Sequence, residues 1–154
     1  MKIADILPRE AVVADLQASD KRGVIEEMSA LIASCAGLFD QGELARVLKE
    51  REALRSTGIG LNVAIPHTKI QGANGIIAAL GRSRAGVNFD ALDGQPVKLF
   101  FVLIGGLNSA EARFKALRKI YRLLKDDETR EALISCGSSV EMYDIISRQD
   151  NKFD

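Results

Sequence analysis

The feature that most constrains the fold is an uninterrupted apolar run near the middle of the chain, Leu99 to Ile104. A strand that is apolar at every position has no face for solvent, so it must be covered on both sides. The run is also far too short to cross a bilayer, which takes about 20 residues in a helix. The sequence therefore predicts a central strand inside a sheet, and it predicts no insertion into a membrane.

Shorter apolar runs, set among glycines, indicate the other strands of this sheet. The glycines recur through the middle third of the chain, where they separate short β-forming segments. The predicted strands cover residues 12–14, 63–65, 76–80 and 87–89. Asp93-Gly94 is typical of a tight turn and should precede the central strand.

Helical spacing of apolar residues marks the segments on either side of this glycine-rich part. Asp20 is expected to cap a first helix, which should end at Gly37. Asp40 and Glu43 have the spacing of a capping box and predict a second helix that runs to about Arg51. The apolar residues expected to pack these two helices are Val24, Met28, Leu31, Ile32, Cys35, Leu44, Val47 and Leu48.

Two further helices are predicted in the last third of the chain. Asn108 with Glu111, and Ser138 with Glu141, have the spacing of helix starts. The residues expected to face inward on these helices are Phe114, Leu117, Tyr121, Leu124, Met142, Ile145 and Ile146. Helices before and after a block of strands predict an α/β fold. We expect residues 1–154 to form a single-domain sandwich with a central mixed β-sheet covered by helices on both faces.

The composition fits a globular domain and argues against binding to polyanions. Hydrophobic residues make up 47% of the 154 residues and charged residues 27%. Lys plus Arg equals Asp plus Glu, 21 against 21, so no net charge favours nucleic acid or an acidic membrane. One predicted helix nevertheless has a run of basic residues, namely Arg113, Lys115, Arg118, Lys119, Arg122 and Lys125. We expect this run to be a solvated helix face, with nucleic-acid binding as the alternative.

The chain has too few ligands for a typical metal site. It has one histidine, and its two cysteines, Cys35 and Cys136, lie far apart in apolar helical patterns. Such cysteines are usually buried as small hydrophobic residues, so we predict no metal site. The first residues include Asp5 where a signal peptide would be apolar, which predicts a cytoplasmic protein.

The single histidine, His67, lies in an unusual segment. A lone histidine is more often an ordinary core or surface residue, so its interpretation depends on its neighbours. His67 follows a short apolar stretch and Pro66, and the proline fixes the backbone where the ring emerges. The role of the imidazole therefore depends on the residues that precede this stretch.

A glycine-containing turn with two hydroxyl side chains lies shortly before His67. Successive backbone N–H groups in such a turn can bind an anion, and Ser56 and Thr57 add donors beside Gly58. Arg51 and Arg55 add positive charge that suits phosphate. Each feature alone is typical of an ordinary turn or helix end. Their combination indicates a phosphate group held near His67.

The segment from Arg51-Glu52 through Ser56-Thr57-Gly58-Ile59-Gly60 to Ala64-Ile65-Pro66-His67 resembles a known signature. It is similar to the phosphorylation site of the fructose/mannitol-type enzyme IIA proteins of the bacterial phosphotransferase system. The resemblance extends over nearly the whole chain, because Ser19-Asp20-Lys21-Arg22 resembles the family's opening and residues 87–97 resemble its hairpin. A short chain with this opening is most similar to the nitrogen-branch, regulatory members.

Two positions differ from the family pattern. Asn62 stands where the family often has glycine. Members commonly have a second histidine in the helix after the central strand, where this chain has Arg113 or a neighbour. An arginine can neutralise a phosphoryl group, but it cannot accept a proton at neutral pH.

The resemblance implies a phosphotransferase that works through a phosphohistidine intermediate. His67 would accept the phosphoryl group from a histidine phosphocarrier protein, and Arg51 would neutralise charge during transfer. The resemblance implies these phosphate-binding residues: Ser56, Thr57, Gly58 and Arg113. No cofactor is implied, because phosphohistidine is already a high-energy donor.

The resemblance favours a regulatory, nitrogen-branch-like enzyme IIA whose recipient is a regulatory target protein. Two alternatives stay open. The protein could be a sugar-specific enzyme IIA that passes phosphate to a IIB domain. It could instead be a regulatory binding module in which the phosphate is only a switch.

Overall fold

The computed structural model describes residues 1–36 and 40–153. The helices are α1 (Lys21–Ala36), α2 (Gln41–Leu54), α3 (Ala110–Lys125), α4 (Asp127–Ser135) and α5 (Ser139–Lys152), and two short 3-10 turns are η1 (Ile3–Asp5) and η2 (Arg9–Ala11). The strands are β1 (Val12–Val13), β2 (Gly58–Gly60), β3 (Val63–Ala64), β4 (His67–Lys69), β5 (Ile76–Val87) and β6 (Val97–Gly105).

The strands form one mixed sheet with β6 at its centre. The strand order is β1-β5-β6-β3-β2, and β4 also pairs with β6. β5 runs antiparallel to β6, whereas β3 and β4 run parallel to it. All residues from Leu99 to Ile104 lie in β6 and are buried. The prediction of a central strand that is apolar on both faces is confirmed.

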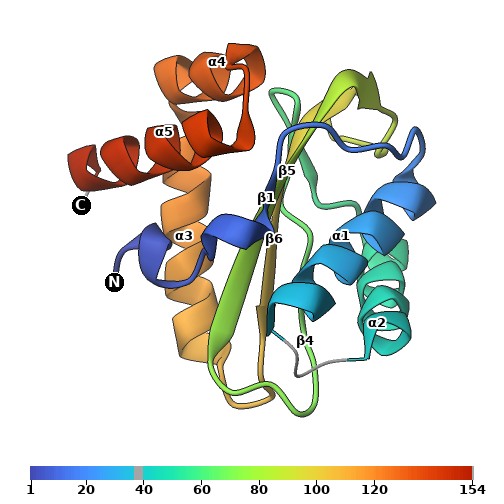
Figure 1. Cartoon of the computed structure of the whole chain (residues 1–154). Coiled ribbons are helices and arrows are strands. Elements are labelled where there is room, and N and C mark those ends of the chain that lie inside the picture. Colours follow the sequence, from blue (N-terminus) through green and yellow to red (C-terminus); the bar gives the residue numbers. More distant parts are fainter. Residues whose placement is uncertain (37–39, 154) are drawn as a thin grey trace.

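Two layers of helices enclose the sheet. Figure 1 shows α1 and α2 on one face and α3, α4 and α5 on the other, with the N-terminal turns beside α3 and α5. Buried side chains from both layers and from the sheet belong to one hydrophobic core. The predicted α/β sandwich is therefore confirmed. Within the described residues, no helix has both the length and the apolar character needed to cross a membrane.

Three predicted helix starts are confirmed by their hydrogen bonds. The backbone N–H three residues further on donates to the side chain of Asp20 (2.8 Å), Asp40 (2.9 Å) and Ser138 (3.1 Å). These bonds satisfy N–H groups that a helix leaves unpaired in its first turn. α2 ends at Leu54, three residues beyond the predicted end at Arg51.

The start of α3 differs from the prediction. Ser109, not Asn108, occupies the N-cap position, and its hydroxyl donates to the carbonyl of Gly106 (2.5 Å). The chain makes a tight turn here, because the Ser109 N–H also donates to the Gly106 carbonyl (3.1 Å). As a result, α3 begins one residue later than the capping pattern predicts.

The predicted inward stripe of α3 is wrong at two aromatic positions. Phe114 is 61% exposed and Tyr121 is 46% exposed. The residues that are buried beneath this helix are Ala116, Ile120, Leu123 and Leu124. Both sets have helical spacing, and the prediction followed the larger side chains rather than the smaller, better-packed ones.

The predicted strand at 87–89 is also wrong, because Val87 is the last residue of β5. β5 extends from Ile76 to Val87, through a polar stretch that separates the predicted strands at 76–80 and 87–89. In that stretch Arg82 is fully buried, and its guanidinium donates to the carbonyls of Ala14 (3.0 Å) and Leu133 (2.9 Å). The strand therefore continues through a buried arginine, beyond its predicted end at residue 80.

The remaining predictions concern local features. The turn at Asp93-Gly94 is confirmed, since Gly94 has φ 71° and its N–H donates to the Ala91 carbonyl (3.0 Å). Cys35 and Cys136 are half-buried and pack against the core. The predicted end of the first helix at Gly37 lies outside the described residues.

Candidate functional site

His67 is the first residue of β4, and the central strand holds it in place. β4 runs parallel to β6 with His67 opposite Leu103. The Leu103 N–H donates to the carbonyl of Pro66 (2.9 Å), which fixes the backbone immediately before the histidine. The side chain is half-buried. His67 therefore stands on a short strand that is braced by the rigid centre of the sheet.

One ring nitrogen of His67 is already hydrogen-bonded within the protein. Nδ1 lies 2.7 Å from the carbonyl oxygen of Ile65. A carbonyl oxygen can only accept, so Nδ1 must carry the proton when the ring is neutral. The lone pair of the neutral ring is then on Nε2. The backbone of the preceding strand thus selects one tautomer of the imidazole.

The surroundings keep the pKa of His67 below its ordinary value of about 6.5. Burial is the largest cause, because it disfavours the charged ring. The bond to Ile65 and the nearby Glu52 carboxylate raise the pKa, while the charges of Arg51 and Arg113 lower it further. The ring is therefore neutral at neutral pH. Both predicted arginines therefore lie close enough to His67 for their charges to act on its ring.

The end of α2 supplies Arg51 to this site. Arg51 is half-buried, and its Nη1 donates to the backbone carbonyl of Arg55 (2.9 Å). This bond ties the Arg51 side chain to the backbone just after the end of α2. Arg55 itself is exposed, and its carbonyl rather than its side chain takes part in this arrangement.

The first turn of α3 supplies Arg113. Its Nε donates to the hydroxyl of Ser109 (3.0 Å). Its aliphatic stem lies directly over Gly105, where an added Cβ would come within 2.6 Å of the arginine Cδ. Gly105 ends β6 opposite Lys69 of β4. The absence of a side chain at Gly105 therefore lets Arg113 lie close to the strand that carries His67.

The predicted phosphate donors in the turn after α2 are hydrogen-bonded within the protein. The Ser56 hydroxyl donates to the carbonyl of Phe89 (2.7 Å) and accepts from the N–H of Gly58 (3.0 Å). Thr57 is buried, and both its N–H (3.0 Å) and its hydroxyl donate to Glu52. In this structure these groups fix the shape of the turn.

The backbone after this turn adopts an unusual conformation. Gly60, Leu61 and Asn62 all have positive φ (93°, 60° and 65°). Asn62 stands where the family often has glycine, and asparagine tolerates this region better than most residues. The Asn62 amide donates to the Pro96 carbonyl (2.8 Å), and the N–H of Leu61 donates to Asp93 (3.1 Å). These two bonds tie the backbone after β2 to the loop before β6.

Glu52 is a residue of this region to which the sequence pattern assigned no role. Glu52 is buried and forms an ion pair with Lys21 of α1 (3.1 Å) in addition to its bonds to Thr57. Lys21 also lies over the ring of Phe89 (4.7 Å), whose carbonyl binds Ser56. Glu52 therefore joins α1, α2 and the turn. Its position beside Arg51 was visible in the sequence, but its partner on another helix was not.

We expect Glu52→Ala to lower the free energy of unfolding by about 2–3 kcal/mol. Loss of one partner of a buried pair costs about 3–5 kcal/mol, and Lys21 is partly exposed, which reduces this cost. Glu50→Ala is the matched control, since Glu50 lies on the same helix in an exposed pair with Arg46. Chemical denaturation of both variants measures the difference. Equal stabilities would show that Glu52 does not anchor the turn.

The lowered pKa of His67 predicts the pH dependence of the site. The folded ring binds fewer protons than the unfolded one, so its contribution to stability is lost as pH falls below about 6.5 through the folded pKa. Above about pH 6.5 the ring is neutral in both states and contributes no pH dependence. The ring resonances of the single histidine, followed by NMR in folded and urea-unfolded protein, give both midpoints. A folded midpoint at or above the unfolded one would contradict this account.

Comparison with known proteins shows the family to which the chain belongs. Residues 5–149 match the family model described as "Phosphoenolpyruvate-dependent sugar phosphotransferase system, EIIA 2". The chain belongs to this EIIA family. The recognition of an enzyme IIA protein from the segment around His67 is thereby confirmed, and so is the expected fold.

Relatives include both regulatory and sugar-transport members of the EIIA family. The nitrogen regulatory protein of Bradyrhizobium diazoefficiens is 32% identical over 147 residues, which cover 96% of this chain and 95% of that protein. The fructose-specific EIIABC component of Bacillus subtilis is 32% identical over 150 residues, which cover 97% of this chain. The chain spans only about a quarter (24%) of the length of that component.

A solved structure shows the same fold with similar sequence. The nitrogen regulatory protein IIA-Ntr from Neisseria meningitidis superimposes with a TM-score of 0.86 at 32% identity. The superposition covers 94% of this chain and 98% of that chain. The similarity to nitrogen regulatory proteins, predicted from the opening segment, is therefore confirmed.

Proposed function

We propose that this EIIA protein accepts a phosphoryl group on Nε2 of His67 from a histidine phosphocarrier protein. The observation that carries the proposal is the orientation of the ring. Nδ1 is committed to the Ile65 carbonyl, so the nucleophilic lone pair belongs to Nε2. The lowered pKa keeps the ring neutral, which is the form that can attack. The protein is in this sense a phosphotransferase with a phosphohistidine intermediate.

The transfer exchanges one nitrogen–phosphorus bond for another. The Nε2 lone pair attacks the phosphorus of the donor's phosphohistidine, and a new N–P bond forms as the old one breaks. The electron pair of the broken bond returns to the donor's ring nitrogen. His67 need not release a proton, because its Nδ1–H stays on the Ile65 carbonyl. Such transfers depend on positioning and on fixed positive charge, and this one requires no metal or nucleotide.

Arg51 and Arg113 are the residues that would stabilise the charge of the transferred group. Both already act on the charge state of His67, and they come from opposite layers of the fold. Their guanidinium groups can bind phosphate oxygens in pairs. The phosphate-binding role of Ser56, Thr57 and Gly58 stays a prediction, because each is hydrogen-bonded within the protein here. For these residues we propose first a role in holding the turn that shapes the site.

Intact-mass analysis of a reconstituted reaction tests the proposal. The full chain is incubated with enzyme I, histidine phosphocarrier protein and phosphoenolpyruvate. We expect a gain of one phosphoryl group that is lost in acid, as a phosphoramidate should be. A parallel reaction without the phosphocarrier protein should give no gain. Absence of any gain in the complete mixture, or an acid-stable one, would contradict the proposal.

We propose further that the protein is a regulatory enzyme IIA of the nitrogen branch. The similarity to nitrogen regulatory proteins over nearly the whole length of both chains supports this assignment. The alternative is a sugar-specific enzyme IIA that passes phosphate to a IIB domain, which the fructose-specific relative keeps open. A third possibility is a binding module that uses the phosphate only as a switch.

The regulatory assignment predicts that a target protein distinguishes the two phosphorylation states. A phosphoryl group adds about −1.5 to −2 charges near neutral pH, by analogy with phosphate esters. A partner that covers unmodified His67 would have to desolvate this anion without pairing it, which costs several kcal/mol. Calorimetry of a candidate target with phosphorylated and unmodified protein measures the difference. Equal affinities would favour the sugar relay over regulation of that target.

A further inference from the structure

Helix α3 is strongly basic, while the rest of the molecule is acidic. The helix holds six of the chain's 21 basic residues but only one of its 21 acidic residues, Glu111. The remaining residues therefore have a net charge of −5. The zero net charge of the whole chain conceals this separation. Such a separation creates a local field that a partner of opposite charge can recognise.

The solvent side of α3 combines these cations with aromatic rings. We define the basic face of α3 as its exposed residues Phe114, Lys115, Arg118, Tyr121, Arg122 and Lys125. They are spaced three, four and seven residues apart, so they lie on one side of the helix. Arg118 lies over the ring of Phe114 and Lys125 over that of Tyr121, each with its charge 5.9 Å from the ring centre. The face is therefore an alternation of charge and apolar surface.

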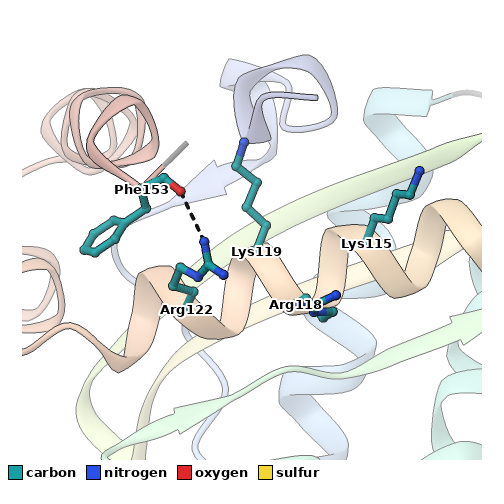
Figure 2. A pocket seen from close by; sticks show the side chains of 5 residues that line it. All are labelled: Lys115, Arg118, Lys119, Arg122 and Phe153. Atoms are coloured by element: carbon teal, nitrogen blue, oxygen red, sulfur yellow. Dashed lines mark hydrogen bonds between the residues drawn. The ribbon is translucent and has the colours of Figure 1, made fainter.

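A small hollow lies along this face. Figure 2 shows the side chains of Lys115, Arg118, Lys119 and Arg122 along α3, with Phe153 at one end. The hollow has a volume of about 240 Å³. Arg122 donates to the backbone carbonyl of Phe153 (3.5 Å), and this contact is drawn in Figure 2. Lys119 is mostly buried and ion-paired with Asp150 (3.2 Å), so it lines the hollow without extending into solvent.

Most cations of the basic face lack a carboxylate partner in the described part of the chain. Arg118, Arg122 and Lys125 form no ion pair with any described residue, and Lys115 has only an exposed pair with Glu111 (3.4 Å). A self-neutralised helix face looks different, as α2 shows. There Arg46 lies 2.6 Å from both Glu43 and Glu50. The basic face of α3 therefore has charges that its own helix does not neutralise.

We propose that the basic face of α3 binds an acidic segment of a partner protein, in which carboxylates alternate with apolar side chains. Arginine binds carboxylate in a bidentate manner, and the exposed rings offer contact area to apolar residues. The 16-residue helix is about 24 Å long, enough for a helical segment of similar length. A longer nucleic acid would extend beyond this strip over residues whose net charge is −5, which gives it no further overall attraction.

This surface is distinct from the phosphoryl-transfer site. Arg113, whose charge lowers the pKa of His67, lies at the start of α3, whereas Arg118, Arg122 and Lys125 lie one to three turns further along. Binding of an acidic segment therefore does not require the histidine. A protein with His67→Ala should bind such a segment as well as the unchanged protein does. Failure of the transfer reaction would leave this inference standing, and failure of this inference would not affect transfer.

Fluorescence anisotropy with a defined probe tests the inference. The probe is a labelled helical peptide of about 16 residues with glutamates on one side and leucines beside them, a length that matches α3. We expect Arg118→Glu with Arg122→Glu to weaken its binding by about tenfold or more, since several exposed charge pairs become repulsive. Arg118→Gln with Arg122→Gln should give an intermediate loss. Thermal unfolding of each variant checks that the helix still forms.

Two controls make the result specific. Arg148→Glu makes the same charge reversal at one exposed arginine on α5, half the total change of the double variant, and should leave peptide binding unchanged. Single-stranded RNA of matched length and charge is the competing probe. Peptide binding that is absent, or equal in the unchanged and Arg118→Glu/Arg122→Glu proteins, would overturn the inference. Tighter binding of the RNA than of the peptide would overturn it in favour of a nucleic-acid surface.

Discussion

His67→Ala should abolish phosphoryl acceptance completely and leave the fold intact. His67 is the only histidine, and its neutral ring presents Nε2 as the acceptor because Nδ1 is bound to the Ile65 carbonyl. Alanine removes the nucleophile, and no other side chain in the chain forms a phosphohistidine. Acid-labile labelling from phosphorylated carrier protein measures the effect. Labelling that persists in this variant would refute the assignment of His67.

The expected preservation of the fold follows from the backbone. β4 is held by main-chain bonds to β6, and the half-buried ring adds one hydrogen bond to the carbonyl of Ile65. We therefore expect a loss of at most about 1–2 kcal/mol in unfolding free energy, the cost of one hydrogen bond and limited packing. Circular dichroism and thermal unfolding of the same preparation separate loss of chemistry from loss of structure.

Arg51→Ala should slow phosphorylation by about 10²–10³-fold, the effect of removing a single charge-stabilising donor. Arg51 is directed by its bond to the Arg55 carbonyl and acts electrostatically on His67. Arg51→Lys should recover only part of the rate, because an ammonium group lacks the planar guanidinium fork. Stopped-flow transfer from the phosphorylated carrier measures both variants.

Arg55→Ala is the matched control for Arg51. The Arg55 side chain is exposed, and only its backbone carbonyl contacts Arg51. Its removal should leave the transfer rate close to that of the unchanged protein. Equal rates for Arg51→Ala and Arg55→Ala would mean that Arg51 does not stabilise the transferred group.

The fold could be predicted from the sequence because its strongest signals are of two kinds. One is the pattern of apolar and polar residues, and the other is a set of short-range helix caps. Leu99 to Ile104 could only be a strand covered on both faces, and the caps at Asp20, Asp40 and Ser138 use short-range hydrogen bonds. These signals do not depend on which distant segments meet. For the same reason the position of His67 after a short strand and a proline was predictable.

The failures of prediction involve contacts between distant segments. The inward stripe of α3 was assigned in part to two large aromatic residues, but Ala116 and Ile120 are the ones that are fully buried. Arg82 lies between two predicted strands, yet it is buried within β5, where its guanidinium donates to carbonyls from two distant segments. The ion pair of Glu52 with Lys21 joins α2 to α1, and no local sequence pattern indicates it.

In the candidate site, too, local features could be predicted and contacts between distant segments could not. The sequence indicated His67, Arg51 and an arginine near position 113, and in the structure the charges of both arginines lower the pKa of His67. It could not show that Thr57 and Gly58 would be occupied within the protein, since Glu52 and Ser56 take up their donors. Nor could it indicate which ring nitrogen is free, because that depends on the turn of the backbone at Ile65.

Nitrogen-edited NMR of histidine-labelled protein, before and after phosphorylation, tests the central claim most directly. The single histidine gives one pair of ring nitrogen signals. In the unmodified protein at neutral pH, we expect a protonated Nδ1 and an unprotonated Nε2. After transfer, the phosphorus coupling should appear on Nε2 while Nδ1 keeps its proton on the Ile65 carbonyl. Phosphorus attached to Nδ1, or an unchanged ring in a phosphorylated protein, would contradict the account.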